Sequence, residues 1–266
     1  MLRWILLPLL LVATVHAQQY EGKTLVKPRL IANATAVVPG KPLEVGLLLE
    51  TAPTWHTYWE YSGDGGFPTT IAWTLPEGFT AGPIQWPLPE REFLPGDIES
   101  YGYKDEVLLV TTITVPADFR ETSLTIHANA SWLVCAEVCL PGNAALELTL
   151  PVASQAEPAN QELFTKFRNL LPSRNPPPYQ LEWKAGPEDM TLTVTGLEGV
   201  KSVDVFPLPS EGQQVGHPKN SEITNGRATI TIPAKGPLRG VLVVETESGK
   251  KGWFVSSEDK ATPSAP

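Results

Sequence analysis

The sequence predicts an all-β protein with two β-domains that are joined by one helix. Two observations carry this prediction. The chain of 266 residues contains 27 prolines and 21 glycines, a composition typical of short strands joined by turns. Runs of aliphatic and β-branched residues recur along the chain, and one stretch has the apolar spacing of an amphipathic helix.

The N-terminus, residues 1–17, has the pattern of a secretory signal peptide. Arg3 precedes an apolar run over residues 4–15, and small residues follow before Gln18. An uncleaved membrane anchor fits less well, because the run is about 12 residues long and a bilayer requires roughly 20. We therefore predict an exported, periplasmic protein whose mature chain begins near Gln18.

The charge of the chain limits the classes of partner. Its formal net charge is −9, and the basic residues form no cluster, which argues against nucleic-acid binding. No later apolar stretch approaches the length of a membrane span. We therefore expect no direct membrane insertion after signal cleavage, so that any membrane partner is another protein.

The first predicted domain is an immunoglobulin-like β-sandwich over residues 22–153. Stretches rich in β-forming residues alternate with turn sequences that contain Gly and Pro. Many short strands at this spacing favour a sandwich of the immunoglobulin type. The clearest predicted strands are residues 43–49, 107–115, 124–134 and 144–152.

Residues 154–178 form the predicted connection to the second domain. Apolar side chains recur at helical spacing between residues 160 and 171, which predicts one amphipathic helix. Pro172 ends this helix, and the three prolines at 176–178 predict a stiff linker.

A second, smaller β-sandwich is predicted over residues 179–256. Its length suffices for a small sandwich with a modest core. A polar tail, residues 257–266, is expected to be flexible. The predicted strands of this domain are residues 191–195, 200–206, 228–232 and 240–245.

The two cysteines of the chain, Cys135 and Cys139, are separated by three residues. In an exported protein, such a pair normally forms a disulfide. A bond that closes about five residues removes only about 2 kcal/mol of chain entropy, so it is a weak staple. Small-ring disulfides are also the more easily reduced ones. These arguments favour a pair that exchanges disulfides over a structural disulfide or a metal site.

The strand before Cys135 alternates, with apolar residues at even positions from Leu124 to Val134 and polar residues at the odd positions 125, 127, 129 and 131. An unbroken strand therefore places Cys135 on the polar face and not in the core. Residues 140–143 include Pro, Gly and Asn, which favour turns, so we expect a turn there before the return strand. We expect the pair near the end of a hairpin, where the thiol of another protein can reach it.

Several motifs around the pair resemble the N-terminal domain of the DsbD-like protein-disulfide reductases, and the ScsB-like branch in particular. The resemblance covers roughly residues 24–152. It rests on the segment 132–142, which contains both cysteines, and on residues 55–59, 63–69, 73–78, 84–87 and 101–103. Residues 179–256 are similar to the region that follows in ScsB-like proteins.

The resemblance implies an immunoglobulin-like fold and a redox role for Cys135 and Cys139. In this family the pair takes electrons from a membrane-embedded partner domain and passes them to oxidised periplasmic proteins. The second cysteine forms the mixed disulfides, a role that would fall to Cys139. The family also caps its site with an aromatic side chain, for which Tyr61 and Phe67 are candidates.

Full-length family members continue into a transmembrane domain and a thioredoxin-like domain. This sequence contains neither, so we expect a separate, membrane-embedded electron donor of the DsbD/ScsB type. The expected clients are oxidised periplasmic thiol proteins. As an enzyme, the chain would be a component of a protein-disulfide reductase, and no cofactor or metal is predicted.

Two other functions stay open at this point. The chain could be a non-catalytic periplasmic interaction module whose disulfide pins a hairpin. It could also bind copper or zinc, although His56, His127 and His217 form no ligand cluster in the sequence. We interpret His56 as a packed core histidine, His127 as solvated and His217 as a loop residue.

Two further patterns have a structural explanation. The aromatic stretch 55–61 could stack on a sugar, but aromatic residues in a β-sandwich more often pack in the core or at an edge. Glu60 and Asp64 could form a paired-carboxylate hydrolase site, but acidic residues in a Gly-rich loop are usually solvated turn residues.

Overall fold

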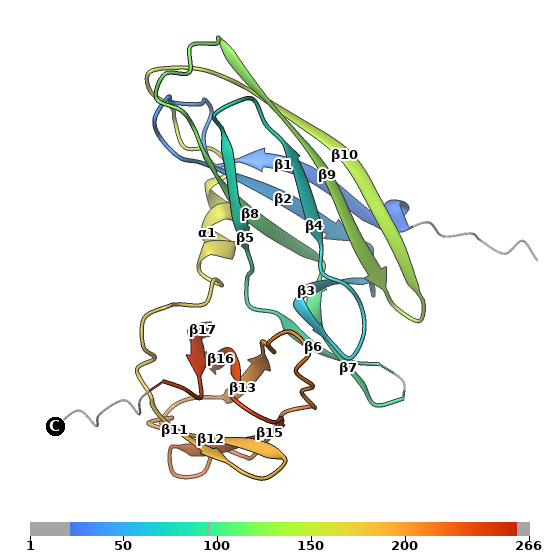
Figure 1. Ribbon diagram of the computed structural model, residues 1–266, viewed down its shortest axis with the longest axis vertical. Coiled ribbons are helices and arrows are strands. Elements are labelled where there is room, and N and C mark those ends of the chain that lie inside the picture. The colour runs from blue at the N-terminus through green and yellow to red at the C-terminus, as the bar shows by residue number, and fades with distance from the viewer. Residues whose placement is uncertain (1–21, 95, 260–266) are drawn as a thin grey trace, which may run out of the picture.

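The computed structural model describes residues 22–94 and 96–259 and is almost entirely β. The predicted signal peptide and residues 260–266 of the predicted tail lie outside the described residues. Figure 1 shows the strands in two groups, with one α-helix between them. The elements are η1 Gly22–Thr24, β1 Val26–Ala32, β2 Leu43–Thr51, β3 His56–Gly63, β4 Thr70–Thr74, β5 Thr80–Gln85, β6 Glu90–Leu94, β7 Ile98–Lys104, β8 Glu106–Thr114, β9 Ser123–Cys135, β10 Cys139–Pro151, α1 Gln161–Arg168, β11 Gln180–Ala185, β12 Asp189–Thr195, β13 Ser202–Pro207, β14 Lys219–Asn220, β15 Arg227–Pro233, β16 Arg239–Thr246 and β17 Gly249–Ser256.

The first β-domain consists of β1–β10 in two antiparallel sheets. One sheet has the order β1-β2-β8-β5, and the other has the order β10-β9-β3-β7-β6, with β4 also paired to β9. β2 and β8 are apolar on both faces, because one face meets the other sheet and the opposite face is covered in part by α1. This arrangement confirms the predicted immunoglobulin-like sandwich.

The longest hairpin, β9–β10, runs along one side of the first β-domain (Figure 1). The alternation in β9 is confirmed, because all even positions from Leu124 to Val134 are buried. The predicted turn is wrong: residues 140–143 belong to β10, and the turn spans only residues 136–138. Gly142 allows this pairing, since a Cβ atom there would lie 2.4 Å from Nε1 of Trp132.

Helix α1 connects the two β-domains and buries Phe164 and Phe167 in the core of the first one. It is shorter than predicted, because the chain tightens after Arg168 into i→i+3 turns that end at Pro172. The linker that follows is fixed by backbone hydrogen bonds. The Ser173 amide donates to the Gly252 carbonyl, and the Phe254 amide donates to the Ser173 carbonyl.

The second β-domain consists of β11–β17 in two smaller sheets, with the orders β11-β12-β15-β14 and β13-β16-β17. All four strands predicted for this region are confirmed, and β11, β14 and β17 are additional. Its own core lies between the two sheets and includes Leu192, Ile230 and Leu242.

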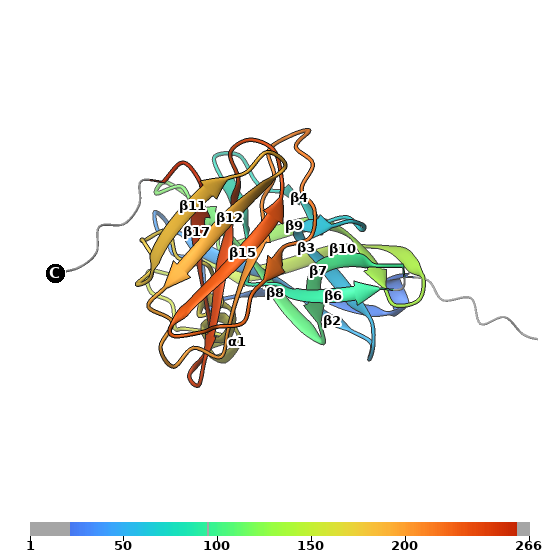
Figure 2. The same cartoon turned by 90° about the horizontal axis from the view of Figure 1, so that it is seen from below.

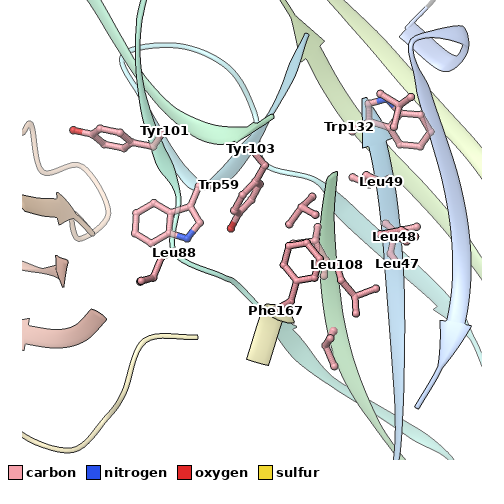
Figure 3. Packing of buried hydrophobic residues seen from close by; sticks show 14 of the residues in the cluster. Leu47, Leu48, Leu49, Trp59, Leu88, Tyr101, Tyr103, Leu108, Trp132 and Phe167 are labelled. Carbon is pink, nitrogen blue, oxygen red and sulfur yellow. The ribbon is translucent and has the colours of Figure 1, made fainter. Parts of the chain in front are cut away.

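The two β-domains share a packed contact. Phe206 and Val241 of the second domain belong to the same apolar cluster as Trp59, Leu88 and Tyr101 of the first domain. Figure 3 shows these three first-domain side chains beside one another at the end of the sandwich that faces the second domain. In Figure 2, seen from below, the second-domain strands lie across this end. The described helices include none that is long and apolar enough to cross a bilayer.

Candidate functional site

The cysteine pair closes the end of the β9–β10 hairpin. Cys135 is the last residue of β9 and Cys139 the first residue of β10, and their sulfurs are bonded. The two Cα atoms are cross-strand partners 4.1 Å apart. Between them the Ala136 amide donates a hydrogen bond to the Val138 carbonyl at 3.1 Å. The hairpin thus presents the disulfide at its tip, as predicted.

The two cysteines differ in exposure. Cys139 is exposed, and the next residue towards the turn, Val138, is 58% exposed. Cys135 is 0% exposed, so the expectation that its face is open to solvent is wrong. The register itself holds, since Cys135 is outside the core cluster and lies opposite His56 of β3. The odd positions of β9 before it are exposed or half-buried, whereas Cys135 is buried where β3 pairs beside it at the hairpin tip.

Tyr58 supplies the hydroxyl beside the exposed sulfur. Its Oη lies 3.7 Å from Sγ of Cys139, while the whole residue is only 1% exposed. Burial raises the pKa of the Tyr58 hydroxyl, which therefore stays protonated and can donate a hydrogen bond. Sequence reasoning missed this residue. The signal was the alternation in β3, where His56 and Tyr58 share one face and Trp59 takes the core face.

His56 packs behind Tyr58, as the interpretation of a packed histidine predicts. The two rings meet edge to face with centroids 5.1 Å apart, and His56 is 2% exposed. Desolvation lowers the pKa of His56, a nearby Glu92 carboxylate opposes this shift and Lys104 adds to it. The imidazole is therefore neutral at neutral pH and places no positive charge beside the sulfurs.

The β3–β4 loop, residues 64–69, lies against Tyr58. Gly66 has φ +99°, and a Cβ atom there would lie 2.3 Å from the Tyr58 ring, so only glycine allows this close approach. The Ser62 hydroxyl donates to the Gly66 carbonyl at 3.0 Å and holds the loop closed. Of the two aromatic candidates for a cap, Tyr61 packs against Tyr101, and Phe67 is 73% exposed within this loop. Tyr58 takes the position beside Cys139.

The other sequence candidates separate in space. His127 is exposed and pairs with Glu147 at 3.4 Å, about 27 Å along the strand from Cys135. Asp64 and Glu60 do not face one another as a pair of catalytic acids. Asp64 accepts the Glu99 amide at 2.9 Å, whereas Glu60 lines a groove with Arg174 between the domains. Within residues 22–94 and 96–259, no group of three or more His, Cys, Asp or Glu residues could hold a metal ion.

The fold and the disulfide together define an immunoglobulin-like domain with a disulfide at the tip of its longest hairpin. Residues 23–151 match the family model for the N-terminal domain of the thiol:disulfide interchange protein DsbD. This part of the chain is therefore a DsbD/ScsB-like N-terminal domain, as its motifs predict.

Among solved structures, the N-terminal periplasmic domain of ScsB from Proteus mirabilis has a similar fold. The alignment covers 85% of this chain and 92% of that chain, with 17% sequence identity and a TM-score of 0.64. It extends beyond the region of the family match, so it includes much of the second β-domain.

Two further solved structures align with the chain but share little structural similarity with it. Domains 5–6 of the S-layer protein SbsC align over 87% of this chain and 96% of theirs, with 13% identity and a TM-score of 0.23. A marsupial T cell receptor aligns over 88% of this chain and 98% of its own, with 12% identity and a TM-score of 0.20. No curated protein sequence matches the chain.

Proposed function

We propose that the protein is a periplasmic thiol–disulfide exchange protein whose Cys135/Cys139 couple relays electrons. The electrons come from a membrane-embedded reductase of the DsbD/ScsB type and pass to oxidised periplasmic proteins. One observation carries this proposal: the disulfide at the hairpin tip joins one exposed cysteine, Cys139, to one buried cysteine, Cys135. Such an arrangement allows one defined sulfur to meet a partner and the other to resolve the product.

The exchange follows from this asymmetry. In the reduced protein, the Cys139 thiolate attacks a client disulfide, forms a mixed disulfide and releases one client thiolate. The Cys135 thiolate then attacks Sγ of Cys139, which restores the Cys135–Cys139 bond and releases the second client thiolate. The client gains two electrons and the pair loses two, which the membrane partner supplies again through the same chemistry in reverse.

Two features of the surroundings support a relay of electrons. The exposed Glu137 carboxylate lies between the cysteines and opposes thiolate formation, which disfavours a strongly oxidising couple. Exposed apolar side chains on the hairpin tip and the β3–β4 loop, Val138 and Phe67, offer contact area for a partner. The periplasmic location rests on the signal-like N-terminus and on the periplasmic ScsB domain of similar fold.

The reduction potential of the native protein tests the proposal. We expect a value within the range of known exchange proteins, roughly −120 to −270 mV, measured by thiol alkylation in glutathione buffers. The double variant Cys135→Ser/Cys139→Ser gives the background level of thiol alkylation. A potential well below about −300 mV, or reduction only after unfolding, would identify the bond as structural. The chain would then be better described as an interaction module.

Replacing Tyr58 with phenylalanine should lower the potential of the couple by roughly 10–30 mV. A hydrogen bond from its hydroxyl stabilises a Cys139 thiolate more than it stabilises the disulfide, by about 0.5–1.5 kcal/mol, and about 1.4 kcal/mol corresponds to 30 mV. Tyr61→Phe is the matched control, since the Tyr61 ring packs on Tyr101. Equal potentials for the two variants would show that the Tyr58 hydroxyl does not act on the sulfur.

A further inference from the structure

His217 reaches from the second β-domain to the first. It lies in the connection between β13 and β14, and the residues just before it are anchored within the second domain. The Gly216 amide donates to the Pro233 carbonyl at 2.7 Å, and Val215 forms a β-bridge with Ala234. The histidine is therefore presented from a fixed point of the second domain.

His217 contacts the β3–β4 loop of the first domain. Nε2 of His217 makes a short hydrogen bond with Oδ2 of Asp64, the first residue of that loop. Nδ1 lies 4.0 Å from Oε2 of Glu99 on β7. Asp64 also makes two hydrogen bonds with the Glu99 backbone: its amide donates to the Glu99 carbonyl, and its carboxylate accepts the Glu99 amide, both at 2.9 Å. The start of the loop is thus held from both domains.

A polar cluster between the two domains lies behind this contact. This cluster, the polar seam, consists of Arg91, Glu99, Tyr101, Asp204 and Asn220. Arg91 of β6 pairs with Glu99 and with Asp204 of β13, so it connects the two domains. The Tyr101 hydroxyl donates to Glu99 at 2.5 Å, and the Asn220 side-chain amide donates to Asp204 at 3.0 Å. Because these partners hold Glu99 in place and Glu99 in turn binds Asp64, His217 meets two positioned carboxylates, those of Asp64 and Glu99.

The loop in turn contacts the redox pair through Tyr58. Gly66 packs on the face of the Tyr58 ring, and Oη of Tyr58 lies 3.7 Å from Sγ of Cys139. A continuous set of contacts therefore runs from the second β-domain through Asp64, the loop and Tyr58 to the exposed sulfur.

We propose that His217 is a positioning residue through which the second β-domain holds the β3–β4 loop over Tyr58 and thereby limits access to the Cys135–Cys139 bond. This regulatory role rests on the proposed exchange function. When the contact between His217 and Asp64 is lost, the loop lifts more often from Tyr58, and the sulfurs become easier to attack from the side of β3. The second β-domain thus restrains the β3–β4 loop beside the redox site.

The test is His217→Ala in the full chain, with two readouts. Amide hydrogen exchange over residues 64–69 should accelerate about two- to fivefold, the factor expected when one partly exposed side-chain hydrogen bond is lost. Reduction of the Cys135–Cys139 bond by dithiothreitol should accelerate by a similar factor. His217→Gln keeps a side-chain donor for Asp64 and should restore both rates towards those of the unsubstituted protein.

His127→Ala is the matched control, since it removes another exposed histidine–carboxylate pair, with Glu147, on the same hairpin as the cysteines. It should leave both rates unchanged. Unchanged hydrogen exchange at residues 64–69 in His217→Ala would overturn the proposal that His217 restrains the β3–β4 loop. So would equal rates in His217→Ala and His127→Ala. A bond that dithiothreitol reduces only in the unfolded protein would contradict the exchange function, while hydrogen exchange would still decide the role of His217.

Discussion

The variant Cys135→Ser is expected to form a stable mixed disulfide through Cys139, whereas Cys139→Ser is expected to form none. The reason is that Cys139 is exposed and Cys135 is completely buried beside His56. Removing the buried sulfur leaves the attacking one in place but prevents the second exchange, so the intermediate persists. Removing the exposed sulfur leaves a thiol that no partner can approach in line.

The measurement is the rate at which each single-cysteine variant reacts with an aromatic disulfide reagent, followed by intact mass. Cys139→Ser should react at least about tenfold more slowly, since every 1.4 kcal/mol needed to open the buried site costs a factor of ten. Both rates should become equal in denaturant, which controls for intrinsic reactivity. Equal rates in the native variants would contradict the assignment of Cys139 as the sulfur that meets partners.

Arg91→Ala should cause the largest loss of stability among charge-removing substitutions in the contact between the β-domains, about 3–5 kcal/mol in the free energy of unfolding. Arg91 is 14% exposed at its side chain and pairs with Glu99 at 3% and Asp204 at 23% exposure. Its removal leaves the nearly buried Glu99 carboxylate without its cation. Arg91 also lies over the Tyr101 and Phe206 rings at 5.3 Å and 5.2 Å, so apolar packing is lost as well.

Urea unfolding of Arg91→Ala and Arg29→Ala provides the comparison. Arg29 also pairs with a glutamate, Glu50, but the two side chains are 58% and 40% exposed, and the expected loss is below about 1 kcal/mol. Arg91→Lys should recover part of the stability, because it keeps the charge and loses the forked geometry. A loss below about 1 kcal/mol for Arg91→Ala would show that the seam does not stabilise the packed domains.

Local patterns in the sequence determined the class of fold and the chemical group at the site. Alternation with a period of two predicts β9 and its buried face, because side chains of a strand point alternately to its two sides. The helical spacing around Phe164 and Phe167 predicts α1 in the same way. The close spacing of Cys135 and Cys139, four positions apart, and the motifs around them predict the disulfide and the family match.

Tertiary structure alone decided which sulfur is accessible and what surrounds it. Cys135 has the register of an exposed residue, yet it is buried at the end of the sheet where β3 pairs with β9 and His56 lies opposite it. The contact of Tyr58 with Cys139 joins residues 81 positions apart, and that of His217 with Asp64 joins residues 153 positions apart. Local periodicity states which way a side chain points, but it carries no information about what distant part of the chain lies there.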